Sequence, residues 1–486
     1  MVCAFAAGAL LAVFRLTQRL LSPAAAVAVT LLTAVYPIWF AQSSLAHADI
    51  FAAAFTFAAF ALYLPATAPF PLSFRSVAEE SASRPTRRTL FTIATLFSLA
   101  ALSKETAIVE PAVLAAMHVI LLLRTRATHK IRVPRVRTLG PGLSPALESP
   151  ATHLRWIATL STPLLPLLAW YAYHHAKTGF TFGNPEYLRY NATANLTAAH
   201  IYTAIYYRFL HLFWQRNIWL PIVLSIACLF LPRRPKSEAQ SLQPTTLTTI
   251  AILIAGNWLA FSILGGAILT RYLLPIYPLI LLACVATWRE RTRIWPYLAL
   301  LTGVAFFSAL WLNPPTSFAP EDNLTYRNMI VVHQEAAAYI AEHYPDATVL
   351  TAWPAAAELF RPDLGYVQRS IKVTPVENFT FAEVQKAAQE PDQFDTAMVF
   401  TTHYTSPALS RYLLTHPNSR RGREYATERD LHPREIASIL HGTIVWQDER
   451  DGEWAAVLRF NRSYEASNNP PLPLLTTRNQ KLTTHN

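Results

Sequence analysis

Long apolar runs separated by short charged segments make up the first two thirds of the chain. Each run approaches the roughly 20 apolar residues that a membrane-spanning helix needs. Ten of them are recognised, at residues 1–14, 22–41, 46–65, 89–103, 106–123, 156–174, 217–232, 246–265, 272–288 and 295–312. The pattern therefore predicts a polytopic α-helical membrane protein with about ten transmembrane helices.

The segments between these runs alternate in their content of Lys and Arg. Lys and Arg gather in every second connection, at residues 15–19, 75–88, 124–137, 233–236 and 289–293. Since positive loops stay on the cytoplasmic side, these connections are predicted to be cytoplasmic. The opposite, outer face receives the 42–48 turn, Lys104 and Glu105, the 175–216 segment, Arg271 and everything after the last run. The net charge of +11 is thus explained by topology, and no nucleic acid partner is expected.

The last third of the chain has the composition of an ordinary soluble domain. Helical spacing of apolar residues marks 328–344 and 432–442, whereas 347–353 and 395–403 are predicted to be buried strands. Asp451-Gly452 between two alternating runs predicts a hairpin turn. The expected domains are a transmembrane part at 1–314, an α/β extramembrane domain at 315–465, and a polar, disordered tail at 466–486.

Arg271 is the only charged residue in the fifty positions from 239 to 288. A guanidinium beside hydrocarbon costs a few kcal/mol at least, so it is expected to have a function and an anionic partner. The alternative is an Arg whose head reaches the interface and marks a helix end.

Three more groups share the outer face with Arg271. Lys104 and Glu105 lie between two apolar runs, and the alternative for them is mutual neutralisation, with Glu110 as a further partner. His47 and Asp49 precede the third run, where Asp49 also suits a helix N-cap. The 177–197 segment mixes Gly, Pro, aromatic and charged residues and suits an ordered binding loop.

Two cations and nearby carboxylates at one membrane interface suit an anionic lipid whose head group reacts there. Arg271 and Lys104 are expected to hold a phosphate, and Asp49 to act as base or to orient a hydroxyl. No phosphate-binding glycine-rich motif occurs in the sequence. Three scattered cysteines in apolar runs give no metal spacing, so no metal site is predicted.

The order of these motifs resembles a known family. S-K-E-T between two helices, T-G-F-T-F-G-N-P-E-Y in a large outer loop, and R-Y-L-L-P at a helix start are similar to motifs of bacterial polyprenyl-phosphate-dependent glycosyltransferases of the GT-C superfamily. The nearest groups are the family 39 protein mannosyltransferases and the lipid A aminoarabinose transferases. The resemblance covers roughly residues 1–312, and the rest is similar to the variable periplasmic domain of many members.

The resemblance implies transfer of a sugar, with inversion, from a polyprenyl-phosphate donor to a protein, lipid or glycan acceptor at the periplasmic face of the bacterial inner membrane. Asp49 matches the acidic position of the family's second outer loop and is the expected catalytic residue of this chain. The substrate-binding positions are Arg271, Tyr272, Lys104, Glu105, His47, Asn184, Glu186 and Tyr187. No cofactor is required on charge grounds, because two cations are available for the phosphate, and a divalent metal is left open.

The resemblance also implies a helix before Met1 and a first outer loop with a key acidic residue, usually the catalytic base, and both are absent from this sequence. The expectation is that the protein is longer at its N-terminus, and the alternative is an inactive relative. A transporter or lipid flippase is the competing function, although such proteins are expected to show internal repeats and charges at mid-membrane. The third hypothesis is a non-catalytic membrane scaffold that displays the C-terminal domain.

Overall fold

The structure is a computed structural model, and it divides the chain into two compact units. One unit holds residues 1–314 and 319–326, and the other holds residues 315–318 and those from 327 onward. The structure describes residues 1–67, 85–130, 149–182, 196–235, 241–264, 268–313, 318–402, 404, 407–416, 418–419, 422–423, 425 and 429–460.

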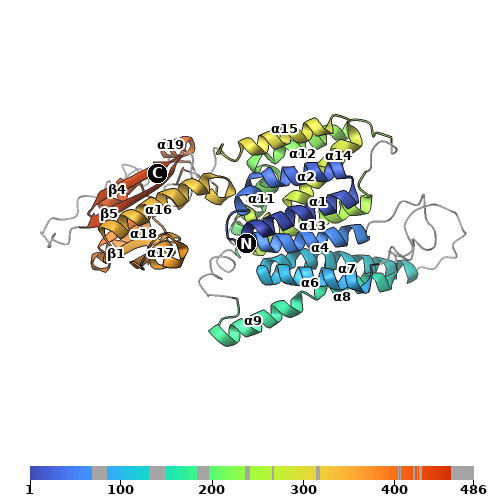
Figure 1. The fold of residues 1–486 in the computed structure, drawn as a ribbon, viewed down its shortest axis with the longest axis horizontal. Coiled ribbons are helices and arrows are strands. Elements are labelled where there is room, and N and C mark those ends of the chain that lie inside the picture. Colours follow the sequence, from blue (N-terminus) through green and yellow to red (C-terminus); the bar gives the residue numbers. More distant parts are fainter. Residues whose placement is uncertain are drawn as a thin grey trace, which may run out of the picture. The chain divides into compact units, whose positions relative to one another are not determined.

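The first unit is made of helices packed side by side (Figure 1). Four helices or helical runs are long and apolar enough to cross a membrane, at Val2–Leu20, Ala48–Thr67, Glu105–Arg126 and Pro244–Leu264, among the described residues. The predicted membrane protein is thereby supported. The helices are α1 (Val2–Leu20), α2 (Pro23–Val35), α3 (Pro37–Gln42), α4 (Ala48–Thr67), α6 (Arg87–Ser103), α7 (Val109–Lys130), α8 (Pro150–Ser161), α9 (Leu164–Thr178), α11 (Ala198–Phe213), α12 (Trp219–Leu229), α13 (Pro244–Leu264), α14 (Tyr277–Arg291) and α15 (Trp295–Ser308).

Prolines account for two differences from the predicted helices. The predicted segment 22–41 is two helices, because Pro37 follows Tyr36 and a helix seldom continues through the residue before a proline. The predicted segment 156–174 is likewise divided into α8 and α9 at Pro163. Helix α11 lies within the predicted 175–216 outer segment and was not predicted, since its apolar residues alternate with His, Thr and Arg.

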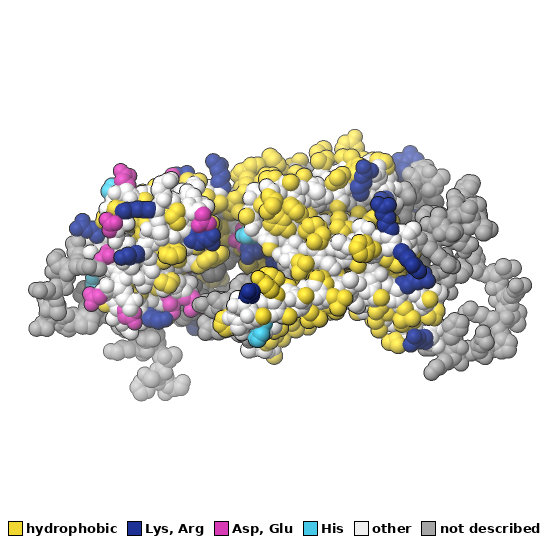
Figure 2. Space-filling view, turned by 60° about the horizontal axis from the view of Figure 1, so that its bottom comes forward, with side chains coloured by type: hydrophobic (Ala, Val, Ile, Leu, Met, Phe, Trp, Pro, Cys, Tyr) yellow, Lys and Arg dark blue, Asp and Glu magenta, His cyan; other side chains and the backbone are white. Residues whose placement is uncertain are grey.

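The two ends of this unit differ in chemistry, as the loop charges predicted. The Arg19 guanidinium at the end of α1 donates to the Ala61 carbonyl near the end of α4, at 2.8 Å. Arg291 donates to the Leu231 carbonyl at 2.7 Å, which brings two further predicted cytoplasmic loops together. Figure 2 shows Lys and Arg gathered at one end of the helical unit, with hydrophobic side chains over its sides. The residues of the predicted outer face meet at the opposite ends of these helices.

The second unit is an α/β domain with one five-stranded sheet in the order β2-β1-β3-β5-β4. Its strands are β1 (Thr348–Ala352), β2 (Lys372–Val376), β3 (Thr396–Phe400), β4 (Gly442–Arg450) and β5 (Glu453–Phe460), and its helices are α16 (Thr325–His343), α17 (Ala355–Phe360), α18 (Phe381–Ala387), α19 (Pro407–Thr415) and α21 (Pro433–Ile439). Strands β2, β1 and β3 are parallel, and β5 pairs antiparallel with β3 and β4. The predicted helices and strands are present here, and β2 is an addition.

The hairpin between β4 and β5 has the turn that the sequence predicts. Asp451 and Gly452 both have positive φ, at 51° and 87°, which is the conformation of a two-residue type I′ turn. Asp and Gly tolerate this region better than other residues, so the dipeptide fixes the register of the hairpin.

A glycine sets the closest approach of two helices in the first unit. A Cβ atom at Gly256 of α13 would lie 2.6 Å and 2.8 Å from the two γ-carbons of Val113 in α7. The Val side chain is stiff at χ1 and cannot easily turn away. This contact therefore depends on the absence of a side chain at position 256.

We expect Gly256→Ala to lower the free energy of unfolding by about 1–3 kcal/mol, the usual cost of overpacking a filled site. Gly303→Ala is the matched control, because its Cβ would meet Leu32 at an ordinary 3.7 Å. Thermal unfolding in detergent compares the two variants. Equal midpoints would show that α7 and α13 separate at no cost.

Candidate active site

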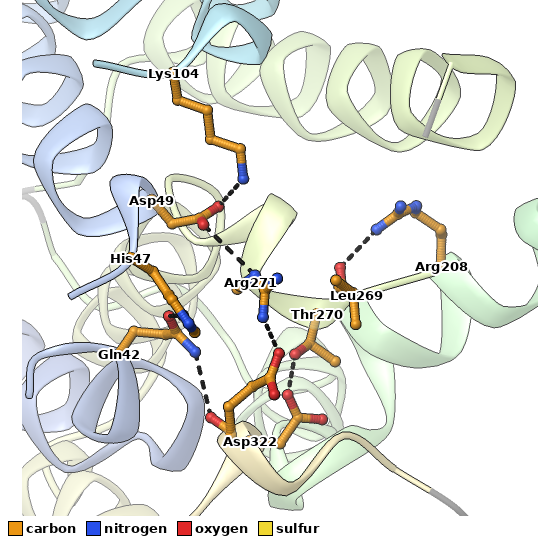
Figure 3. A network of polar contacts seen from close by, with 10 residues as sticks. Gln42, His47, Asp49, Lys104, Arg208, Leu269, Thr270, Arg271 and Asp322 are labelled. Atoms are coloured by element: carbon orange, nitrogen blue, oxygen red, sulfur yellow. Dashed lines mark hydrogen bonds and ion pairs between the residues drawn. The ribbon is translucent and has the colours of Figure 1, made fainter. Parts of the chain in front are cut away.

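Asp49 lies at the centre of the predicted outer face, in the first turn of α4. Its carboxylate forms an ion pair with the Lys104 ammonium, and its second oxygen lies 3.6 Å from Nε of Arg271. The Asp49 side chain is only 7 % exposed, so these two cations provide most of its polar surroundings. Figure 3 shows the three side chains pointing toward one another from three separate elements.

Local structure places the two cations. Lys104 ends α6 in an extended conformation, with φ −154°, and the chain then turns into the short 3₁₀ helix Glu105–Ile108. Arg271 belongs to another 3₁₀ helix, Thr270–Leu273, which precedes α14. Burial lowers the pKa of Lys104, and the Asp49 carboxylate opposes that effect. Both cations are therefore held at helix ends, where the chain changes direction.

Two acids that the sequence analysis did not assign complete this cluster. Glu321 forms an ion pair with Nη1 of Arg271, and Asp322 accepts a hydrogen bond from the Thr270 hydroxyl. Both lie in the 3₁₀ helix Pro320–Asp322, and burial raises the pKa of Asp322. Their segment follows the last predicted transmembrane run, so the sequence predicts it on the same face as Arg271. That shared face is the one feature of the sequence that could have indicated these two acids.

Residues 319–326 were assigned to the second domain from their composition. In the structure they group with the helical unit. The reason is visible in the side chains, since Glu321 and Asp322 both bond to the 270–271 segment. Composition alone does not reveal such a pairing.

His47 and Gln42 support the same segment. His47 Nδ1 lies 2.9 Å from the Gln42 side-chain oxygen, and the Gln42 amide donates to the Glu321 carbonyl at 3.3 Å. Burial, assisted by the charge of Arg271, lowers the pKa of His47 to about 4. His47 is therefore neutral at physiological pH, donates through Nδ1 and positions the Pro320–Asp322 turn.

Tyr272 forms an aromatic wall beside the cations. The Lys104 ammonium lies 4.1 Å from the centre of its ring, and the Arg208 guanidinium carbon 5.4 Å from it. Phe261 stacks on Tyr272 with ring centres 5.8 Å apart. Arg208 of α11 was not predicted; it is fully buried and donates to the Leu269 carbonyl at 2.9 Å. Cation–π contacts of this kind hold the ammonium and guanidinium groups near one surface.

A small pocket, open to solvent, lies among these groups, and its space of about 250 Å³ includes that open solvent. Its charged lining consists of Asp49, Glu110, Lys104 and Arg271, and its aromatic lining of Phe261 and Tyr272. The pocket thus combines two cations, two carboxyl groups and two rings.

Of the remaining predicted site residues, the structure describes Glu105. Glu105 is exposed and does not line the pocket, and Lys104 pairs with Asp49 in its place. Asn184, Glu186 and Tyr187 lie outside the described residues. Within the described ranges, no group of three or more His, Cys, Asp and Glu side chains could hold a metal ion.

Comparisons with known proteins found similarity in structure only. No protein-family model matches the chain, and no curated protein matches it in sequence. The crystal structure of ArnT from Cupriavidus metallidurans bound to undecaprenyl phosphate aligns with 95 % of this chain and 83 % of its own, at 14 % identity and a TM-score of 0.46.

A second solved structure is the Archaeoglobus fulgidus oligosaccharyltransferase in complex with Zn and sulfate. It aligns with 92 % of this chain and 59 % of its own, at 10 % identity and a TM-score of 0.38. Both scores lie below 0.5, so the function proposed below rests on this chain's own residues.

The pKa of His47 gives a testable pH dependence. Unfolded His47 takes up a proton near its ordinary pKa of 6.5, whereas the folded ring stays neutral down to about pH 4. The unfolded state therefore binds more protons in this window, and the folded protein loses stability as the pH falls from 6.5 to 4.

His47→Asn removes this titration and keeps an N–H group for Gln42. We expect the difference in unfolding free energy between wild type and variant to shrink as the pH falls through that window. Parallel stability curves for the two proteins, measured by chemical denaturation in detergent, would contradict the assignment.

Proposed function

We propose that this chain is a membrane glycosyltransferase that moves a sugar from a polyprenyl-phosphate donor to an acceptor at the outer, periplasmic face of the bacterial inner membrane. The observation that carries the proposal is the meeting of Asp49, Lys104 and Arg271 around one pocket. They come from segments far apart in the sequence and lie at one end of apolar helices. Charged groups kept at such a place are expensive and are expected to act on a ligand.

Lys104 and Arg271 are proposed to bind the lipid phosphate. An ammonium has three donors and a guanidinium five, more than the contacts to Asp49 and Glu321 use. As the bond between the sugar's anomeric carbon and the phosphate oxygen breaks, negative charge grows on that oxygen. Cations already held in place stabilise this charge without further rearrangement.

Asp49 is proposed to act on the acceptor. Its carboxylate accepts the proton of an acceptor hydroxyl, whose oxygen forms the new bond to the anomeric carbon while the lipid phosphate leaves. Attack from the side opposite the phosphate inverts that carbon. The pair of cations orients the Asp49 carboxylate from both of its oxygens, as positioning of a general base requires.

Replacing Arg271 tests the phosphate site. We expect Arg271→Ala to reduce kcat for sugar transfer from a polyprenyl-phosphate-linked sugar by about 10²- to 10³-fold, the usual effect of removing one electrostatic stabiliser. Arg271→Lys keeps the charge and is expected to restore part of the rate. Arg15→Ala is the matched control, because Arg15 is exposed and lies in the predicted cytoplasmic connection 15–19, away from the predicted outer face. Unchanged turnover in Arg271→Ala would exclude the phosphate role.

Replacing Asp49 separates chemistry from binding. Asp49→Asn is expected to lower kcat about 10²- to 10⁴-fold, because the amide cannot accept a proton. Binding of the bare lipid phosphate is expected to persist, since both cations remain. A variant with full turnover, or one that has lost lipid binding and transfer together, would argue against the role as base.

Proteoliposomes that contain this chain distinguish a glycosyltransferase from the competing function, a transporter or lipid flippase. A flippase moves the labelled lipid across the bilayer while its sugar stays attached, whereas a transferase releases bare lipid phosphate as the sugar appears on the acceptor. Movement of intact lipid without transfer would replace the present proposal.

A further inference from the structure

Glu110 is a pocket residue whose carboxyl group forms no ion pair within the part of the chain that the structure describes. It lies in the first turn of α7, its side chain is 1 % exposed, and it lines the pocket together with Asp49 and the two cations. Its Oε2 atom is buried and has no hydrogen-bond partner among the described residues. Asp49, by contrast, contacts both Lys104 and Arg271.

An unsatisfied carboxyl oxygen is unfavourable inside a membrane protein. Leaving a buried acceptor without a partner costs about 1–3 kcal/mol, and more for a charged group. Such a group is therefore expected to receive a hydrogen bond from whatever fills the pocket. Since Glu110 presents an oxygen, the matching ligand group is a donor.

The neighbours of Glu110 indicate which part of a ligand meets it. Lys104 and Arg271 line the same pocket and are donors, so they suit the phosphate. Tyr272, Phe261 and Pro275 provide apolar wall, which suits the face of a sugar ring. A sugar joined to the phosphate through its anomeric carbon lies next to these groups and carries hydroxyls as donors.

We propose that Glu110 accepts a hydrogen bond from a hydroxyl group of the donor sugar and so helps to select that sugar. This inference rests on the function proposed above. The sequence analysis considered Glu110 only as a neutralising partner of Lys104, which pairs with Asp49 instead. Glu110 is thus a specificity-determining residue, distinct from the phosphate contacts and from the base.

The test compares the binding of two lipids to this chain in detergent. One is bare undecaprenyl phosphate, and the other is the tightest-bound member of a set carrying mannose, glucose or aminoarabinose. We expect Glu110→Ala to weaken binding of the sugar-bearing lipid about 10- to 100-fold, as for a buried hydroxyl that is left without its hydrogen-bond acceptor. Binding of the bare lipid phosphate is expected to change less than about twofold, since that lipid has no sugar hydroxyl to lose.

Two further variants make the result specific. Glu110→Gln keeps an acceptor oxygen and the shape of the side chain, so it is expected to lose less than Glu110→Ala. Glu290→Gln is the control for charge, because Glu290 pairs with Arg233 at the opposite end of the helical unit. Thermal unfolding of each variant confirms that the pocket is intact.

The outcomes separate this inference from the proposed function. If the wild type binds neither lipid, the proposed function fails. If it binds the bare lipid phosphate and no sugar-bearing lipid more tightly, the function stands and the role of Glu110 is rejected. An equal loss for both lipids in Glu110→Ala, or an effect on the acceptor KM alone, also rejects it.

Discussion

The site depends on one carboxylate shared by two cations. Asp49 brings Lys104 and Arg271 together at the end of the helices, and each of the three would be costly to bury alone. Because the three residues end or begin different helical elements, their attraction also fixes how α4, α6 and the turn before α14 meet. Tyr272 and Phe261 then fill the space beside the cations. Packing and electrostatics here stabilise the same arrangement.

Much of this arrangement could be predicted from the sequence. The apolar runs and the alternation of Lys and Arg predict that Asp49, Lys104 and Arg271 share one face, because the charge of loops indicates membrane orientation directly. The Asp451-Gly452 hairpin was equally accessible, since its turn demands a backbone conformation that few residues adopt. These are cases in which a local rule decides the outcome.

Other features depend on contacts that no local pattern reports. The composition of the chain from Glu321 onward predicts a soluble domain. In the structure, however, Glu321 forms an ion pair with Arg271, fifty positions earlier. Arg208 lies in a helix whose mixed composition hid both the helix and its burial. The spacing in the sequence allows an ion pair between Glu110 and Lys104. In the structure Lys104 pairs with Asp49, which only tertiary packing brings close to it. In each case long-range packing overrides what neighbours in sequence suggest.

The bond between Glu321 and Arg271 has a thermodynamic consequence. Residues 319–326 belong with the helical unit, whereas the chain from Arg327 onward belongs to the α/β domain. An anion that competes for Arg271 therefore weakens the hold on the very segment that leads into that domain. Linkage is reciprocal, so the docking of residues 319–326 weakens the affinity of Arg271 for a competing anion by the same factor. The short turn at Pro320–Asp322 thus links the ionic contacts of Arg271 to the packing of residues 319–326 within the helical unit.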